Sequence, residues 1–127
     1  MKKETMDGKN ISVNLSDNAS NPSVAILTVK GFIDTVTAPE FEKVFHAALN
    51  AQKYKLVVDL EAVNYISSAG WGVFISQIKR IRAQKGDLVL VGMNPEVGEV
   101  FELLEFNSIL KTFPTVEAAV QKAFTGK

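Results

Sequence analysis

The sequence predicts an α/β fold, with a mixed sheet of four to five strands and four helices in a chain of 127 residues. Three observations support this. Apolar and polar residues alternate over 11–15, the short runs 56–60 and 88–91 are almost entirely apolar, and the intervening segments carry apolar residues at helical spacing. Strands that alternate with helices after an initial hairpin are typical of a mixed sheet with helical cover. We expect one domain over 1–127, with an ordered core from about 11 to 124.

The first quarter of the chain predicts a polar tail followed by a hairpin. Residues 1–10 lack an apolar run and are expected to form a loose tail. The alternation over 11–15 indicates a half-buried strand, and the polar stretch 17–23 indicates a loop. A second strand is expected over 24–30, with Gly31 marking a bulge or a kink near its end and strand structure over 31–33 before Asp34.

The later elements follow from helix starts and apolar spacing. Thr37, Pro39 and Glu40 predict a helix start in which Thr37 caps the helix, Pro39 lies in the first turn and Glu40 comes three residues after the cap. The apolar residues of this helix are Phe41, Val44, Phe45, Ala48 and Leu49. The further elements expected, in order, are a strand over 55–60, a helix over 71–83, a strand over 88–91, a helix after Asn94-Pro95, a short strand over 109–113 and a helix from Thr115.

Composition argues against several kinds of site. The 14 basic and 14 acidic residues balance, so nothing draws the chain toward nucleic acid or an anionic membrane. Cysteine is absent and His46 is the only histidine, so a transition-metal site is not expected. No apolar run approaches the roughly 18 residues of a membrane span. We therefore expect no metal, no cofactor, no nucleic acid, no membrane insertion and a cytoplasmic location.

Ser68 lacks the surroundings of a catalytic nucleophile. Such a serine needs a nearby base, and His46 is predicted on the polar side of another helix. The G-x-S-x-G pattern is absent because Ile66 stands at its first glycine. Gly70-Trp71-Gly72 resembles the start of a dinucleotide motif, but Ile75 replaces the third glycine, and the two glycines more simply permit a tight turn and close packing. We expect no enzyme, with a small nucleotide-using enzyme as the alternative from another class.

The stretch 65–72, Tyr-Ile-Ser-Ser-Ala-Gly-Trp-Gly, carries the strongest functional signal. It lies between the strand 55–60 and the helix 71–83, so Ser67 and Ser68 stand where a helix begins. The first turn of a helix has N–H groups without intrahelical partners and the positive end of the helix dipole. A serine there can cap the helix or carry a phosphate where added negative charge is tolerated. The stretch therefore favours a switch over a catalytic pocket.

Three features near this junction have two interpretations each. Trp71 is either a core residue or an exposed aromatic anchor for a partner. Asp34 is either a turn or capping carboxylate or a surface acid near the serines, because both lie at strand-to-helix junctions. A basic cluster at the end of the helix 71–83 is either a solvated helix end or an electrostatic docking patch, and its members are Lys79, Arg80, Arg82 and Lys85.

A resemblance to a known family lies in the order of the elements, in Val57-Val58-Asp59-Leu60 and in the junction over 65–73. In these features the chain resembles the STAS domain, and more narrowly the bacterial anti-sigma factor antagonists. Gly31-Phe32-Ile33-Asp34 is similar to the Gly-x-x-Asp stretch of that family, and 91–95 and 115–119 are similar as well. The resemblance extends over nearly the whole chain, from about Ile11 to Phe124.

This resemblance implies a switch protein. Members of the family bind an anti-sigma factor that has a kinase-like ATPase fold, and this binding releases the sigma factor. The partner phosphorylates a serine in the junction, the modified antagonist dissociates, and a phosphatase resets it. The family motif places the phosphoserine at Ser68. Many members have aspartate at the preceding position, where this chain has Ser67, so Ser67 is a possible second position for the phosphate.

The expected partner surface combines two loops. Both are predicted to open at the carboxyl ends of parallel strands, where the binding sites of such folds gather. The residues of this surface are Asp34, Thr35, Thr37, Ser67, Ser68, Ala69 and Trp71. A STAS subunit of a lipid-transport ATPase, or a stress-signalling scaffold, is the alternative that the same resemblance implies.

Overall fold

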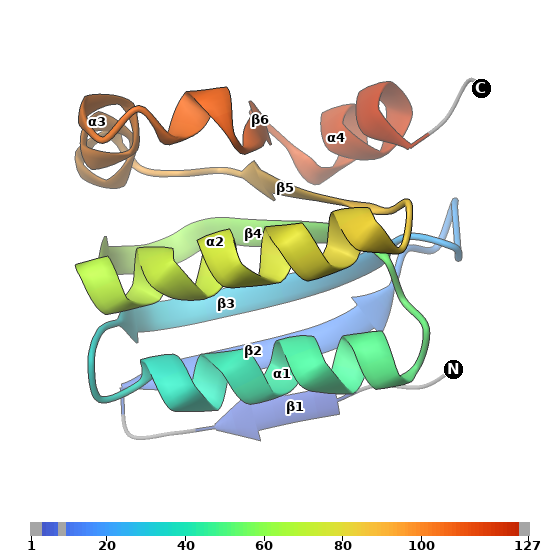
Figure 1. Ribbon diagram of the computed structural model, residues 1–127, viewed down its shortest axis with the longest axis horizontal. Coiled ribbons are helices and arrows are strands. Elements are labelled where there is room, and N and C mark those ends of the chain that lie inside the picture. Colours follow the sequence, from blue (N-terminus) through green and yellow to red (C-terminus); the bar gives the residue numbers. More distant parts are fainter. Residues whose placement is uncertain (1–3, 8–9, 125–127) are drawn as a thin grey trace.

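The computed structural model describes residues 4–7 and 10–124. In these ranges six strands form one sheet in the spatial order β1-β2-β3-β4-β5-β6, antiparallel from β1 to β3 and parallel from β3 to β6 (Figure 1). The strands are β1 (Glu4–Asp7), β2 (Ile11–Asp17), β3 (Ala25–Ile33), β4 (Lys55–Ile66), β5 (Asp87–Val91) and β6 (Lys111–Phe113). The helices are α1 (Ala38–Asn50), α2 (Ser68–Ala83), α3 (Pro95–Leu103), the 3-10 turn η1 (Phe106–Ser108) and α4 (Val116–Ala123). The predicted class, a mixed α/β sheet with four helices, is confirmed.

The sheet has one strand more than predicted, because β1 lies in the stretch expected to be a loose tail. Residues 4–7 pair with β2 in antiparallel register, with Glu4 opposite Leu15. Their sequence, Glu-Thr-Met-Asp, holds a single apolar residue, so hydrophobic patterning does not reveal the backbone pairing that forms this strand. Residues 1–3 and 8–9 of the predicted tail lie outside the described residues.

Helices cover both faces of the sheet. The apolar residues of α1, α2 and α3 pack into one large core with β2 to β5, and α1 and α2 lie side by side along the strands (Figure 1). On the opposite face, Ala119 and Val120 of α4 pack with Val24, just before β3, and with the strand residues Ile26, Val57, Val89 and Val91. Neighbouring strand residues enter different cores, as expected for side chains that alternate across a sheet.

β4 extends further than predicted, and the ends of β3 and β4 place the functional loops. β4 ends at Ile66 rather than at residue 60. β3 continues to Ile33, although its pairing with β4 shifts register beside Gly31. Gly31 has a φ of 104°, and a side chain there would collide with the backbone carbonyl of Asn10, so the predicted irregularity requires glycine. Because Ile33 and Ile66 are register partners, the two strands end side by side.

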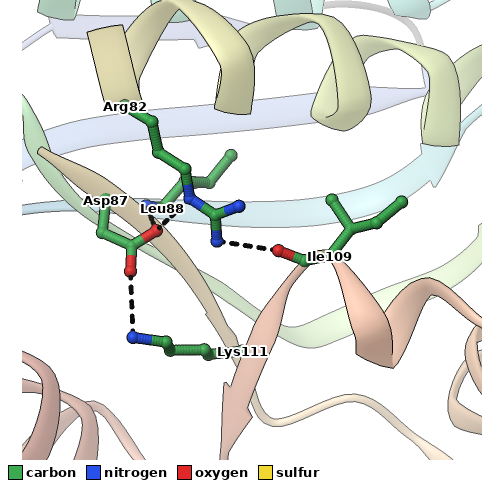
Figure 2. A network of polar contacts seen from close by, with 5 residues as sticks. All are labelled: Arg82, Asp87, Leu88, Ile109 and Lys111. Carbon is green, nitrogen blue, oxygen red and sulfur yellow. Dashed lines mark hydrogen bonds and ion pairs between the residues drawn. The ribbon is translucent and has the colours of Figure 1, made fainter. Parts of the chain in front are cut away.

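A polar network connects β6 and the turn before it to α2 and β5 (Figure 2). The Nη2 of Arg82 donates a 2.7 Å hydrogen bond to the carbonyl of Ile109, and its Nε lies 3.3 Å from Oδ1 of Asp87. The other oxygen of Asp87 pairs with Lys111 Nζ at 3.5 Å, and Oδ1 accepts the N–H of Leu88 at 2.9 Å. Arg82, one member of the predicted basic cluster, therefore contributes to the fold.

Candidate functional site

The β3–α1 loop and the β4–α2 junction lie together at the carboxyl ends of β3 and β4. The N–H of Ser67 donates a 2.8 Å hydrogen bond to the carbonyl of Ile33. Gly70 packs beside the same strand ends, because a Cβ added there would lie 2.7 Å from Ile33 Cγ2 and 2.9 Å from Ile66 Cγ2. The structure thus brings the loop that begins at Asp34 next to the two serines.

Ser67 and Ser68 have different environments. Ser67 is the N-cap of α2: its Oγ accepts the N–H of Gly70 at 3.3 Å, and its carbonyl accepts the N–H of Trp71 at 3.0 Å. Ser68 is the first residue of α2 and is exposed, and its hydroxyl makes no hydrogen bond within the described residues. The prediction that a serine of this junction can cap the helix is confirmed for Ser67, and Ser68 is the more exposed of the two residues.

Asp34 organises the loop before α1. Its Oδ1 accepts the N–H groups of Val36 and Thr37, both at 3.0 Å. This confirms that Asp34 is a turn carboxylate. Its other carboxylate oxygen makes no hydrogen bond within the described residues, and the side chain is half-buried. Asp34 therefore holds the loop through one carboxylate oxygen and leaves the other without a partner among the described residues.

Thr37 does not cap α1 with its side chain, so the predicted capping box is wrong. Thr37 already has helical angles, φ −91° and ψ −14°. Its Oγ1 instead turns back toward the strand, where it accepts the N–H of Asp34 at 2.9 Å and donates to the carbonyl of Phe32 at 2.8 Å. Thr37 is only 4% exposed, so it supports the predicted surface from below and is not a contact residue. Thr35, two residues earlier, is exposed.

Trp71 is a core residue, and its interpretation as an exposed partner anchor is wrong. It is 2% exposed, because it lies on the inner face of α2. Its ring lies 5.6 Å from Phe74, 5.8 Å from Phe101 and 5.1 Å from Phe106, measured between ring centroids. Trp71 therefore joins α2, α3 and η1 beneath the junction, and its Nε1 has no hydrogen-bond partner in the described chain.

Three exposed apolar side chains near the site were not predicted as site residues. Val36 is 77% exposed in the β3–α1 loop, and Tyr65 (54%) lies opposite Phe32 (41%) where β4 pairs with β3. The signal for Tyr65 and Phe32 was present, since each directly precedes a buried isoleucine in the alternation of its strand. Tyr65 lies beyond the predicted end of its strand at residue 60.

Two depressions flank the serine junction. One, of about 340 Å³, lies between α1 and α2 and is lined by residues that include Thr35, Ala69 and Gly72. A Cβ on Gly72 would have nothing within 4 Å, so the interpretation that this glycine permits close packing is wrong. The other, of about 220 Å³, lies between the end of β4 and α3 and is lined by residues that include Tyr65 and Trp71.

His46 lies among charged residues of α1 and α2. His46 is exposed on α1, as predicted, with its Nε2 3.3 Å from Arg80 Nη1 and 3.9 Å from Glu42 Oε2. Within residues 4–7 and 10–124, no group of three or more histidine, cysteine, aspartate or glutamate side chains could hold a metal ion. In the same residues, no helix has the length and apolar character needed to cross a bilayer.

The domain has a mixed sheet and an exposed serine at the N-terminus of a helix. This serine lies between two depressions and beside exposed apolar side chains. These are the features of a regulated protein-binding module. The family model for the STAS domain matches residues 16–119, and the chain belongs to the STAS domain family.

Relatives with described roles are anti-sigma factor antagonists. The chain is 35% identical over 94 residues to BtrV of Bordetella bronchiseptica, whose name marks it as a candidate anti-sigma factor antagonist, and the match covers 74% of this chain and 81% of BtrV. It is 31% identical over 83 residues to the anti-sigma-B factor antagonist of Listeria monocytogenes, and the match covers 65% of this chain and 73% of that protein.

Solved structures with the same fold include two further antagonists. An anti-sigma factor antagonist from Mycobacterium paratuberculosis has a TM-score of 0.78 at 24% identity, covering 91% of this chain and 96% of that chain. The phosphorylated form of SpoIIAA from Bacillus has a TM-score of 0.62 at 15% identity, and the match covers 84% of this chain and 96% of that chain. At these identities the two likenesses show the fold alone.

Proposed function

We propose that this chain is a cytoplasmic anti-sigma factor antagonist that binds a kinase-like anti-sigma factor and is released when that partner phosphorylates Ser68. The environment of Ser68 is the observation that carries the proposal: the hydroxyl is exposed at the first position of α2 and unengaged within the described residues. The names of the relatives support the class of partner. In this proposal, a phosphatase returns the chain to the binding state.

The choice of Ser68 over Ser67 rests on their hydrogen bonds. Ser67 is half-buried, and its Oγ is engaged by the N–H of Gly70. A kinase would have to withdraw this cap to reach the Ser67 hydroxyl, at a cost of about 0.5–2 kcal/mol. Ser68 needs no such rearrangement. Phosphorylation at Ser68 alone is therefore the expected state of the modified chain.

A phosphate on Ser68 would change the surface while the fold persists. It adds a charge of about −1.5 to −2 and three acceptor oxygens. The N-terminal turn of a 16-residue helix tolerates that charge, because unpaired N–H groups and the positive end of the dipole face it. At the centre of an interface the same group would have to be desolvated and would displace fitted contacts. Binding falls for this reason.

The proposed contact surface has Ser68 at its centre. Asp34 and Thr35 lie on the α1 side, and Ala69 follows Ser68 on α2. Phe32, Val36 and Tyr65 add exposed apolar area, and aromatic side chains of this kind often dominate binding energy. Ser67, Thr37 and Trp71 hold the surface in place through the contacts described above.

Binding measurements with two Ser68 variants test the proposal. The partner is first captured from the native host with the tagged chain and identified by mass spectrometry. Ser68→Ala should then bind a kinase-like regulator in the presence of ATP without release, and Ser68→Asp should bind it weakly. Equal affinities for the two variants would refute the switch.

The capture itself distinguishes the alternatives. A lipid-transport ATPase or a stress-signalling complex as the main partner would assign the chain to the second class. Turnover of ATP or GTP by the purified chain alone would favour a nucleotide-using enzyme. Intact mass of the native protein should show a single added phosphate in the released state.

A further inference from the structure

Helix α3 presents an exposed apolar stripe. Leu103 is 79% exposed, Leu104 49% and Val100 39%. Residues at i, i+3 and i+4 are neighbours on a helix surface, so these three lie on one side of α3. Val97 and Phe101 lie next to this stripe on the helix and are in the core. The stripe therefore borders the core, and Leu103 is its most exposed member.

The same helix and the turn after it carry uncompensated negative charge. Four exposed glutamates follow at intervals of three residues: Glu96, Glu99, Glu102 and Glu105. None of them forms an ion pair within the described part of the chain. Residues 88–110 contain no lysine, arginine or histidine. The stripe and these glutamates are called the α3 face below.

Of these glutamates, only Glu96 has a position in α3 that favours negative charge. Glu96 suits the first turn of the helix, where the dipole is positive. Glu102 lies in the last turn, where the dipole is negative, and glutamates three residues apart repel each other. Cations supplied by another molecule would relieve both effects.

A groove adjoins the α3 face. The depression of about 220 Å³ between the end of β4 and α3 is lined by Tyr65, Trp71, Glu96, Val97 and Val100 among others. Val100 belongs to both the groove and the stripe, so the two surfaces are continuous. An apolar side chain could enter the groove while neighbouring cations meet the glutamates.

We propose that the α3 face and its groove bind a cationic amphipathic helix of a partner protein. Apolar side chains of that helix would pack on Val100, Leu103 and Leu104, as in other grooves that receive a helix. Its lysine and arginine residues would pair with the glutamates. Nucleic acid and anionic membranes are disfavoured by the four negative charges. The proposal goes beyond the Ser68 switch and does not require phosphorylation.

Peptide titration into the full chain tests the chemistry of this surface. The probe is a synthetic 14-residue peptide of leucine and lysine at helical spacing, and the matched peptide has glutamate in place of every lysine. In ¹⁵N-labelled protein, the lysine peptide should shift the amides of 64–66 and 96–105, with an affinity that falls as salt rises. The glutamate peptide should not bind.

Matched variants separate this surface from general electrostatic attraction. The double variant Glu99→Lys, Glu102→Lys should weaken binding roughly tenfold or more. The double variant Glu61→Lys, Glu117→Lys, which changes exposed residues of β4 and α4 by the same charge, should bind as the native chain does. Leu103→Gln should also weaken binding roughly tenfold while the far-UV spectrum is unchanged, because this side chain is almost fully exposed.

Three outcomes would overturn the proposal. Equal loss of binding in both charge-reversed variants would show non-specific attraction. Amide shifts that spare 96–105 would place the peptide elsewhere. A dimer of the chain alone in sedimentation equilibrium that is lost in Glu99→Lys, Glu102→Lys would show that a second copy covers the face, through the exposed basic residues Lys79, Arg80 and Lys85.

Discussion

Gly70 lies against Ile33 so closely that a Cβ on the glycine would sit 2.7 Å from Ile33 Cγ2 and 2.9 Å from its carbonyl oxygen. This contact seats the first turn of α2, and with it Ser68, at the end of β3. The separation between the serines and the Asp34 loop therefore depends on the absence of a side chain at position 70.

Replacing Gly70 with alanine should destabilise the domain by about 1–3 kcal/mol, because the added methyl group overpacks the junction. Gly72→Ala is the matched control: its added methyl group meets nothing within 4 Å, and alanine is the better helix former by about 1 kcal/mol. Urea unfolding should thus move the two midpoints in opposite directions. A neutral Gly70→Ala would show that α2 can shift without cost.

Ser67→Ala should lower the free energy of unfolding by about 0.5–2 kcal/mol, because the N–H of Gly70 loses its cap. Ser68→Ala should change it by less than about 0.5 kcal/mol, since its side chain is exposed. Both follow from urea unfolding of the unmodified proteins. Phosphopeptide mapping should find one phosphate per chain in Ser67→Ala. Normal modification of Ser68→Ala would place the switch at Ser67 instead.

Thr37→Val should destabilise the fold by about 1–3 kcal/mol, because the N–H of Asp34 and the carbonyl of Phe32 lose their partner in a buried site. Thr37→Ser keeps the hydroxyl and should recover most of that loss. Thermal unfolding of the two variants makes the comparison. If valine were tolerated as well as serine, the loop would not depend on this hydroxyl.

Arg82→Ala should loosen β6 more than the rest of the sheet, because the 2.7 Å bond to the Ile109 carbonyl and the ion pair with Asp87 are both removed. We expect a loss of about 1 kcal/mol and faster amide exchange over 109–113. Lys79→Ala, an exposed change on the same helix, should leave exchange in that segment unaltered. Uniform acceleration across the sheet would contradict a local clamp.

Hydrophobic periodicity predicted which elements exist better than it predicted where they end. The alternation over 11–15 and the apolar run over 56–60 both correspond to strands. The end of β4 was underestimated because polar Glu61 and Asn64 interrupt the apolar run after Leu60. β1 was missed because its pairing uses the backbone and its sequence is polar.

In the candidate site, sequence patterns predicted the roles of some side chains and not of others. The roles of Ser67 and Asp34 followed from general capping and turn chemistry and agree with the hydrogen bonds observed. Thr37 matched a capping pattern, yet its hydroxyl is engaged by β3 through tertiary contacts that spacing does not reveal. Trp71 had two interpretations until the aromatic residues of α3 and η1 were placed around it.

The spatial order of the strands repeats their order along the chain, with consequences for biosynthesis. Each strand that leaves the ribosome finds its neighbour already made, so we expect the sheet to grow stepwise from the hairpin of β2 and β3. α4 is synthesised after all six strands of the sheet, and until it docks, Val24 and the strand residues Ile26, Val57 and Val89 lack their cover. A nascent chain stalled before residue 116 would therefore be a substrate for chaperones, and a gene truncated at that point should yield an aggregating product.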